Sequence, residues 1–166
     1  MKYPQSSFVW KGVTVTNTWI KSSKIEKYNP VTQVYGIIFN EKKEILVCRE
    51  DENSRWLIPG GHPEEGETFE ETLNREALEE ADVEIEEIQP LGVFKVDFSD
   101  DPKKVIYQSR FVAKLKKLNP QTEDPSSKKT WERKFVPAEK ISEYIKWGEA
   151  GDAMFKDAIE LNGKQN

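Results

Sequence analysis

The sequence has little cysteine and little histidine, with one residue of each among 166. A single cysteine, Cys48, excludes an internal disulfide and a cysteine-rich zinc site. Because Cys48 lies in an apolar run, we expect a buried and unreactive thiol. The lone histidine, His62, lies in a loop, where a histidine is more often incidental than catalytic. The chain therefore has neither a disulfide framework nor a thiolate metal site.

Long apolar runs and a positive net charge are also absent. No run reaches the length of a membrane span, and the first residues lack the apolar core of a signal peptide, so we expect a cytoplasmic protein without membrane contact. The net charge of −5 gives no general attraction for nucleic acid or phosphate. A polyphosphate substrate would need a metal ion or local Lys and Arg side chains, and no nucleic-acid partner is expected.

The length predicts one domain over residues 1–166 with a substantial core. Periodicity and turn residues predict strands over 31–39, 44–49, 56–58, 83–88, 91–98, 105–115 and 131–136. They also predict helices over 69–81, 137–147 and 153–161, the last with Asp152 as its N-cap. Strands that alternate with helices favour an α/β fold, a mixed sheet covered on both faces. In residues 1–30, the alternation over 13–16 predicts a strand or hairpin extension.

The helix predicted over 69–81 has its own start signal. Thr68 is a good N-cap, and Glu71 three residues later completes a capping box. On a helical wheel Glu80 falls within the apolar stripe, between Phe69 and Leu73, and should therefore lean toward the interior.

Carboxylates gathered on the inner side of this helix need compensation, because half-buried acids this close cannot all stay ionised. A divalent cation held by oxygen ligands would supply it, and Arg75 can pair with Glu79 one turn on. Two plainer interpretations stay open: a solvated glutamate-rich helix, and a structural carboxylate cluster without metal.

The stretch 61–83 resembles the Nudix box, G-x5-E-x7-R-E-U-x-E-E-x-G-U with U aliphatic. All charged positions of that pattern are present. In order, its positions are occupied by Gly61, Glu67, Arg75, Glu76, Ala77, Glu79, Glu80, Asp82 and Val83. Asp82 stands where the family has a glycine that ends the helix in a left-handed conformation. Asp tolerates that conformation better than most residues, so we expect Asp82→Gly to be equally stable or slightly more stable.

The resemblance implies a Nudix-type α/β/α sandwich with a mixed β-sheet and a Mg²⁺-dependent hydrolase, with Mn²⁺ as a possible substitute. By analogy with the family, Glu76, Glu79 and Glu80 bind metal together with the Gly61 carbonyl. Arg75 orients a glutamate, and Glu67 supports the metal site. The predicted catalytic residues are therefore Glu67, Arg75, Glu76, Glu79 and Glu80. Either Glu76 or Glu80 is the candidate general base.

The predicted reaction is hydrolysis of a diphosphate bond in a nucleoside diphosphate linked to another moiety, such as a nucleoside triphosphate or a nucleotide sugar. The substrate is a small nucleotide. The alternative is a Nudix-fold module that binds nucleotide without catalysis.

Substrate-binding residues are less clearly marked. Many relatives use a further acidic residue after the hairpin, and Glu123, Asp124 and Glu132 are the candidates here. Arg49, Arg55 and Arg110 could meet phosphate, but surface pairing explains them equally well. The polar loop 119–130 is expected to border the substrate pocket. Residues 1–30 either cap the core or form a dimer contact or substrate wall, so a homodimer is possible.

Overall fold

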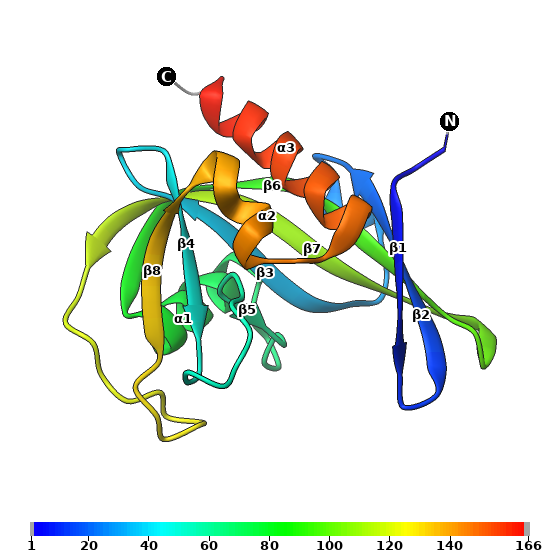
Figure 1. The fold of residues 1–166 in the computed structure, drawn as a ribbon, viewed down its shortest axis with the longest axis horizontal. Helices are drawn as coiled ribbons and strands as arrows, with labels where there is room; N and C mark the ends of the chain where they lie inside the picture. Colours follow the sequence, from blue (N-terminus) through cyan, green and yellow to red (C-terminus); the bar gives the residue numbers. More distant parts are fainter. Residues whose placement is uncertain (1, 165–166) are drawn as a thin grey trace.

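The computed structural model describes residues 2–164 and contains one eight-stranded sheet flanked by helices (Figure 1). The strands are β1 (Gln5–Trp10), β2 (Val13–Lys21), β3 (Val31–Phe39), β4 (Glu44–Arg49), β5 (Gly60–Gly61), β6 (Val83–Phe98), β7 (Asp101–Leu118) and β8 (Glu132–Pro137). The helices are α1 (Phe69–Ala81), α2 (Ile141–Tyr144) and α3 (Gly148–Gly163), with short 3₁₀ turns at Ile25–Lys27 and Ala138–Lys140.

The sheet is mixed, as the sequence predicts. Its strand order is β1-β2-β6-β7-β3-β4-β8. The short strand β5 pairs with Val34 and Tyr35 of β3, on the edge of β3 that faces away from β7. Strands β3 and β7 run parallel, with Val34 opposite Ser109 and Ile37 opposite Val112, whereas the other pairs are antiparallel. Strand β3, buried on both faces from Ile37 to Phe39, is therefore the centre of the fold.

A separate apolar cluster covers each face of the sheet. On one face α1 packs Leu73, Ala77 and Ala81 against β3, β4 and β6. On the other face α3 packs Met154 and Phe155 over β2, β6 and β7. The two helical layers confirm the predicted α/β/α sandwich (Figure 1).

Several predicted boundaries need correction. Residues 56–58 do not form a strand, because only Leu57 bridges to Cys48 before the chain turns into β5. The segments 83–88 and 91–98 form one continuous strand, β6, which passes Pro90 with an irregular register. The predicted helix 137–147 is shorter, a 3₁₀ turn followed by the single-turn α2.

Helix α3 begins a turn earlier than predicted, after Trp147. Asp152 is not its cap; its carboxylate instead accepts a hydrogen bond from Ser142 Oγ at 2.6 Å. Trp147 stacks on Phe155, with ring centroids 6.2 Å apart, and meets Phe94 edge to face. Aromatic packing therefore sets the start of this helix, where the sequence signal favoured a polar cap.

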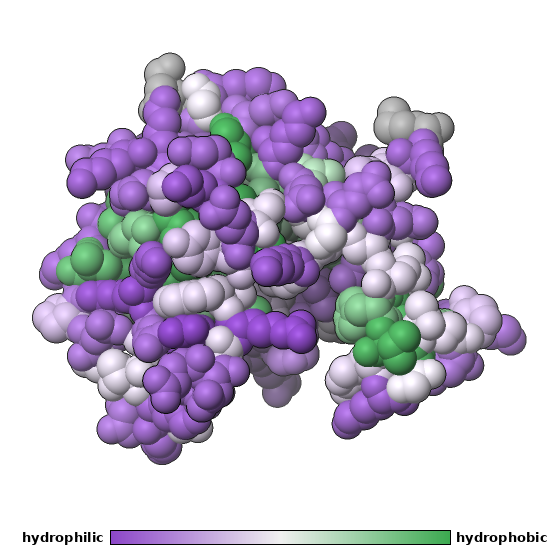
Figure 2. All heavy atoms as spheres, viewed as in Figure 1, coloured by the Kyte–Doolittle hydropathy of each residue, from purple (hydrophilic) through white to green (hydrophobic). Residues whose placement is uncertain are grey.

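The first two strands form the predicted N-terminal hairpin, and β2 joins the sheet through β6. Most of the surface is hydrophilic, but an apolar patch covers this hairpin, where Phe8, Val9 and Trp10 are exposed (Figure 2). The surface is hollowed beside the hairpin in the same view. Within residues 2–164, no helix is long and apolar enough to cross a bilayer.

Candidate active site

The acidic site is built by β5, the loop after it and α1. The capping box forms as predicted: Thr68 Oγ1 accepts from the Glu71 amide at 3.2 Å, and the Glu71 carboxylate accepts from the Thr68 amide at 2.8 Å. At the start of the loop, a Cβ at Gly61 would collide with the Glu76 carboxylate. Glycine therefore lets the backbone of β5 lie directly against the glutamates of α1.

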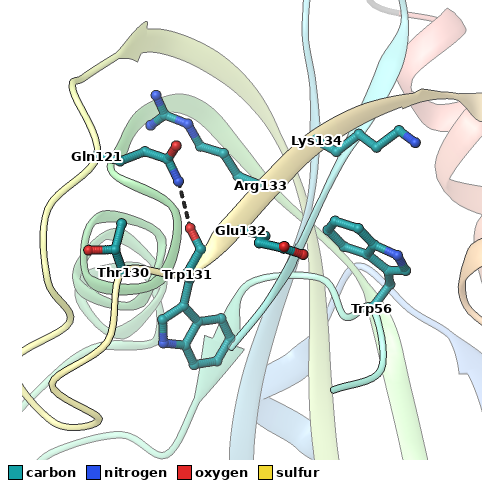
Figure 3. Close-up of a pocket in the computed structure, with 7 residues that line it drawn as sticks. All are labelled: Trp56, Gln121, Thr130, Trp131, Glu132, Arg133 and Lys134. Carbon is teal, nitrogen blue, oxygen red and sulfur yellow. Dashed lines mark hydrogen bonds between the residues drawn. The ribbon is translucent and has the colours of Figure 1, made fainter. Parts of the chain in front are cut away.

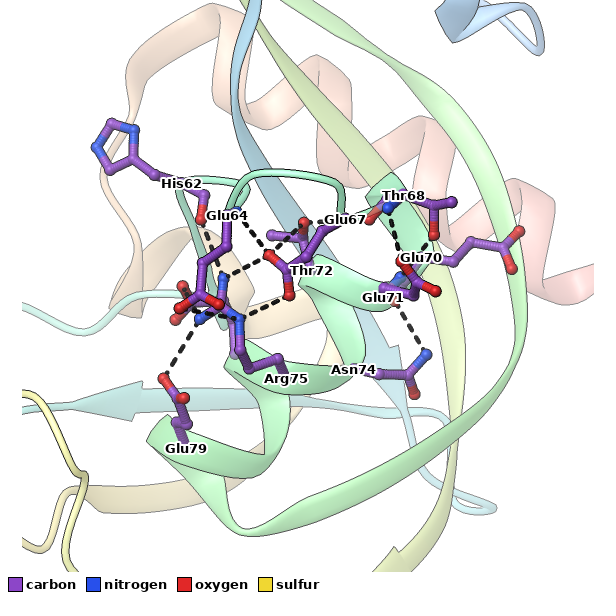
Figure 4. Close-up of polar contacts among 11 residues, drawn as sticks. His62, Glu64, Glu67, Thr68, Glu70, Glu71, Thr72, Asn74, Arg75 and Glu79 are labelled. Carbon is purple, nitrogen blue, oxygen red and sulfur yellow. Dashed lines mark hydrogen bonds and ion pairs between the residues drawn. The ribbon is translucent and has the colours of Figure 1, made fainter.

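Arg75 is the centre of the polar network (Figure 4). Its Nε and Nη2 donate to both carboxylate oxygens of Glu67 at 2.8 and 3.0 Å, and Nη1 donates to Glu76 at 2.9 Å. Glu79 is 3.4 Å from Nη1, which confirms the predicted pair, and Glu64 is 3.8 Å from Nε. One guanidinium therefore faces four carboxylates.

Glu67 is held in a single position by this network. In addition to Arg75, the Glu64 amide and Thr72 Oγ1 donate to its carboxylate, at 2.6 and 3.2 Å. These bonds, the Arg75 contribution being the largest, lower the pKa of Glu67 to about 2. Glu67 is thus an ionised support for Arg75.

Glu80 points into the protein, as the helical wheel predicts, and is 8% exposed. Burial raises the pKa of its carboxyl group, and the adjacent Glu76 raises it further. The buried Cys48 thiol donates to Glu80 Oε2 at 3.7 Å. The expected buried cysteine is confirmed, and the raised pKa favours the neutral, protonated form of Glu80 beside Glu76.

The donor set fits a hard divalent cation. The Gly61 backbone and the carboxylates of Glu76, Glu79 and Glu80 offer only oxygen ligands, which Mg²⁺ prefers. Across the described chain, 2–164, no three His, Cys, Asp or Glu side chains already converge on one point. Glu76 and Glu79 turn instead toward Arg75, so joint ligation requires their carboxylates to rotate.

Asp82 ends α1 in the predicted left-handed conformation, with φ 52° and ψ 43°. Its carboxylate also accepts two bonds from Thr122, from the amide at 2.9 Å and from Oγ1 at 2.6 Å. These bonds tie the loop 119–130 to the end of the helix. The expectation that Asp82→Gly would not weaken the protein considered only backbone conformation and therefore missed this contact.

The structure separates the three candidates for an additional acid. Asp124 is 5% exposed, and its charge raises the pKa of Glu79, although burial of Glu79 is the larger cause. Glu123 is exposed. Glu132 forms an ion pair with Arg49, which also stacks on Trp56 at 4.4 Å. Only Asp124 is thus placed beside the acidic site.

The loop 119–130 contributes to a shallow groove over β8 (Figure 3). Gln121 and Thr130 line it, and Gln121 Nε2 donates to the Trp131 carbonyl at 2.5 Å. None of the residues 119–130 lines a second and larger cavity, which lies beside the N-terminal hairpin. The loop therefore lies beside the acidic site through Asp124, and other elements line that cavity.

This large cavity, of about 760 Å³, lies between the β1–β2 hairpin, the sheet and the start of α3. Apolar walls come from β1, β6 and β7, and Arg55 and Lys146 contribute charge at its edges. Arg110 lies in the wall and is only 2% exposed, so it is not the surface residue considered from sequence. The hairpin thus forms one wall of this cavity.

The cavity adjoins the acidic site through a short chain of contacts. Tyr35 packs over Arg110, and its hydroxyl donates to Gln33 Oε1 at 3.1 Å. Gln33 Nε2 lies 3.4 Å from His62 Nε2, and the His62 carbonyl accepts from Arg75 at 3.0 Å. Sequence reasoning missed Tyr35 and Gln33, because nothing in the alternation of β3 distinguishes them from ordinary strand residues.

Comparison with known proteins agrees with this geometry. The NUDIX domain family matches residues 30–158. The 8-oxo-dGDP phosphatase NUDT18 of Danio rerio is 37% identical over 81 residues, which cover 43% of this chain and 25% of that protein. The chain thus spans about a quarter of the length of that relative.

Solved structures show the same fold. The pyrophosphohydrolase BsRppH of Bacillus subtilis has a TM-score of 0.67 at 22% identity, covering 94% of this chain and 97% of that one. A MutT structure from work on Aliivibrio salmonicida and Vibrio cholerae has a TM-score of 0.55 at 25% identity, covering 79% and 98%. With its box intact at every charged position, the chain belongs to the Nudix hydrolase family.

Proposed function

We propose that this protein is a Mg²⁺-dependent hydrolase of the diphosphate bond in a nucleoside diphosphate linked to another moiety, with Mn²⁺ as an acceptable substitute. The arrangement that carries the proposal is the network of Arg75, in which one guanidinium holds Glu67 and Glu76 beside the buried Glu80. A purely structural cluster would not need so many carboxylates around one cation.

The ion would be held by the Gly61 carbonyl and by Glu76, Glu79 and Glu80. When bound, Mg²⁺ polarises phosphoryl oxygens and lowers the pKa of a ligated water. Arg75 and Glu67 position Glu76 for this task, while Glu76 or Glu80 accepts the proton of the attacking water. Asp124, whose charge acts on Glu79, is the further acid that completes the site when substrate is present.

The nucleoside part of the substrate occupies the large cavity, and the diphosphate crosses to the acidic site over Gln33 and His62. The cavity has apolar and cationic lining residues, which suit a base and a phosphate chain respectively. Arg55 and Lys146 meet phosphate at its edge. The activities of the relatives, an 8-oxo-dGDP phosphatase and a pyrophosphohydrolase, support a nucleotide substrate.

We infer further that residues 1–166 act as one domain in the cytoplasm and bind no nucleic acid, in keeping with the net charge of −5. The exposed edge strand β1, with Phe8, Val9 and Trp10, is the surface for a homodimer.

A phosphate-release screen tests the function. Nucleoside diphosphates and triphosphates, nucleotide sugars, ADP-ribose and dinucleoside polyphosphates are incubated with Mg²⁺, with Mn²⁺ or with a chelator. We expect turnover of at least one class that requires metal and is lost in Glu76→Gln. Nucleotide binding without turnover under every metal condition would instead identify a binding module.

A further inference from the structure

Arg110 is a buried cation without a counter-charge. Among residues 2–164, no carboxylate forms an ion pair with it, and its Nε has no hydrogen-bond partner. Burial lowers the pKa of the guanidinium to about 10, which leaves it charged at neutral pH. An unpaired, buried donor is unfavourable, and the residue lies in the wall of the large cavity.

Three aromatic rings lie close to this guanidinium. Its Cζ lies 4.5 Å from the ring centroid of Tyr35, 4.7 Å from that of Phe94 and 5.6 Å from that of Trp147. These contacts are favourable, and the N–H donors that remain lie in the plane of the guanidinium. A ligand must therefore approach Arg110 with acceptor atoms in the plane of the guanidinium.

The neighbouring Gln108 adds the two donors of its NH₂ group. Arg110 donates to the Ser109 carbonyl at 3.1 Å and to Gln108 Oε1 at 3.2 Å. Because arginine has no acceptor, the Gln108 amide must present its oxygen to Arg110 and turn its NH₂ group away. Among the cavity's lining residues three are cationic, Arg55, Arg110 and Lys146, and none is acidic.

A planar base with two adjacent acceptors matches this arrangement. A 6-oxopurine presents O6 and N7 together as acceptors, which an arginine binds in bidentate fashion, whereas a 6-aminopurine replaces O6 by a donor. The apolar wall from Val96, Phe98 and Ile106 favours an aromatic ring over a hydrated phosphate at this depth.

We propose that Arg110 is a specificity-determining residue that selects a 6-oxopurine base over a 6-aminopurine base. The inference rests on the proposed function only in placing the nucleoside in this cavity. It names an interaction that does not depend on the metal or on hydrolysis.

The test measures binding by calorimetry with a chelator present, so that the result is independent of turnover. Inosine diphosphate, guanosine diphosphate and adenosine diphosphate are compared. We expect both oxopurine nucleotides to bind about tenfold more tightly than the adenine nucleotide, as for one bidentate arginine contact. Inosine diphosphate is decisive, since it shares O6 and N7 with guanine and lacks the 2-amino group.

Three variants connect the preference to Arg110. Arg110→Met, similar in volume and uncharged, should abolish the preference; Arg110→Lys, which keeps the charge but loses the planar edge, should also abolish it. Lys146→Met is the matched control: it removes a charge from the same cavity and should weaken all three ligands equally, with the preference retained. Melting temperatures establish that each variant is folded.

Equal affinity of the unaltered protein for inosine and adenosine diphosphate overturns the proposal, even if no Arg110 variant folds. So does an unchanged preference in folded Arg110→Met, or competition by inorganic pyrophosphate as strong as that by inosine diphosphate. If instead the preference holds and the phosphate-release screen finds no hydrolysis, Arg110 retains its role and only the proposed reaction fails.

Discussion

Arg110 is buried and Arg75 is partly buried, and their surroundings are opposite. Arg75 lies among four carboxylates and a carbonyl oxygen, all within 4 Å. Within residues 2–164, Arg110 contacts three aromatic rings, one carbonyl and one amide oxygen, and no carboxylate. One region therefore has acceptors in excess, and the other has donors in excess.

Under the proposed function, this difference would let one small fold accommodate a ligand with two unlike parts. Excess carboxylates attract a cation, and unused donors attract an acceptor-rich group. Tyr35, Gln33 and His62 connect the regions, so a ligand that satisfies both would lie across β3 and β5. The predictions below test each region against the other.

The largest effect is expected in the acidic site. Glu80→Gln should weaken Mn²⁺ binding by more than about 100-fold, because it removes a buried carboxylate from the oxygen donor set. Calorimetric titration measures this directly. Glu70→Gln, on the exposed side of α1, is the matched control and should bind as the unaltered protein does. Equal heats for Glu80→Gln and the unaltered protein would refute the metal assignment.

Replacing Arg75 or Arg110 by methionine should affect the melting temperature differently. Arg75→Met leaves Glu67 and Glu76 without their charged donor, so we expect a loss of about 2 kcal/mol, or about 4–8 °C in melting temperature. Arg110→Met removes an unpaired buried charge and should leave the melting temperature unchanged or higher. The reverse order in thermal unfolding would show that Arg110 is a structural residue.

A smaller effect on turnover is expected from the loop. Asp124→Asn should lower kcat about tenfold and leave Mn²⁺ affinity in the free protein nearly unchanged. The double change of Glu123 and Asp124 to amides should add little, because Glu123 is exposed. Steady-state kinetics show whether the additional acid lies in the loop or on β8. An unchanged kcat for the double variant, together with a reduced kcat for Glu132→Gln, would assign the additional acid to β8.

The smallest effect concerns the end of α1. Asp82→Gly relieves the left-handed backbone but loses two bonds to Thr122, so we now expect a net loss of about 1 kcal/mol. Urea unfolding measures it. Thr122→Val should show a similar loss, and the double variant should add little to either. A gain of stability in Asp82→Gly would mean that backbone strain outweighs the bonds.

The acidic site was predictable because its residues lie within one short stretch of the sequence, 61–83. The capping box and the inward position of Glu80 follow from spacings within a few helical turns, and the left-handed Asp82 follows from the resemblance to the Nudix box. The same local reasoning was wrong for α3, where Asp152 looked like a cap. At the start of α3, Trp147 packs edge to face against Phe94 of β6, and this tertiary contact determines where the helix begins.

The cavity was not predictable in the same way. Its lining comes from β1, β6, β7 and the start of α3, and no spacing within one segment brings Arg110 near Trp147. Along β7 the sequence shows Arg110 as one charge among many. Only the pairing of β7 with β6 and β3 shows that this position faces the interior.

The parallel pairing of β3 with β7 also fixes an order of events during synthesis. Ser109 Oγ reaches the Gln33 carbonyl across a separation of 76 positions, and such distant pairings form slowly because a long loop must close first. Helix α1, by contrast, can begin to form as soon as residues 68–81 have left the ribosome. On the nascent chain, the residues of α1 therefore emerge well before β7, whose pairing completes the wall that holds Arg110.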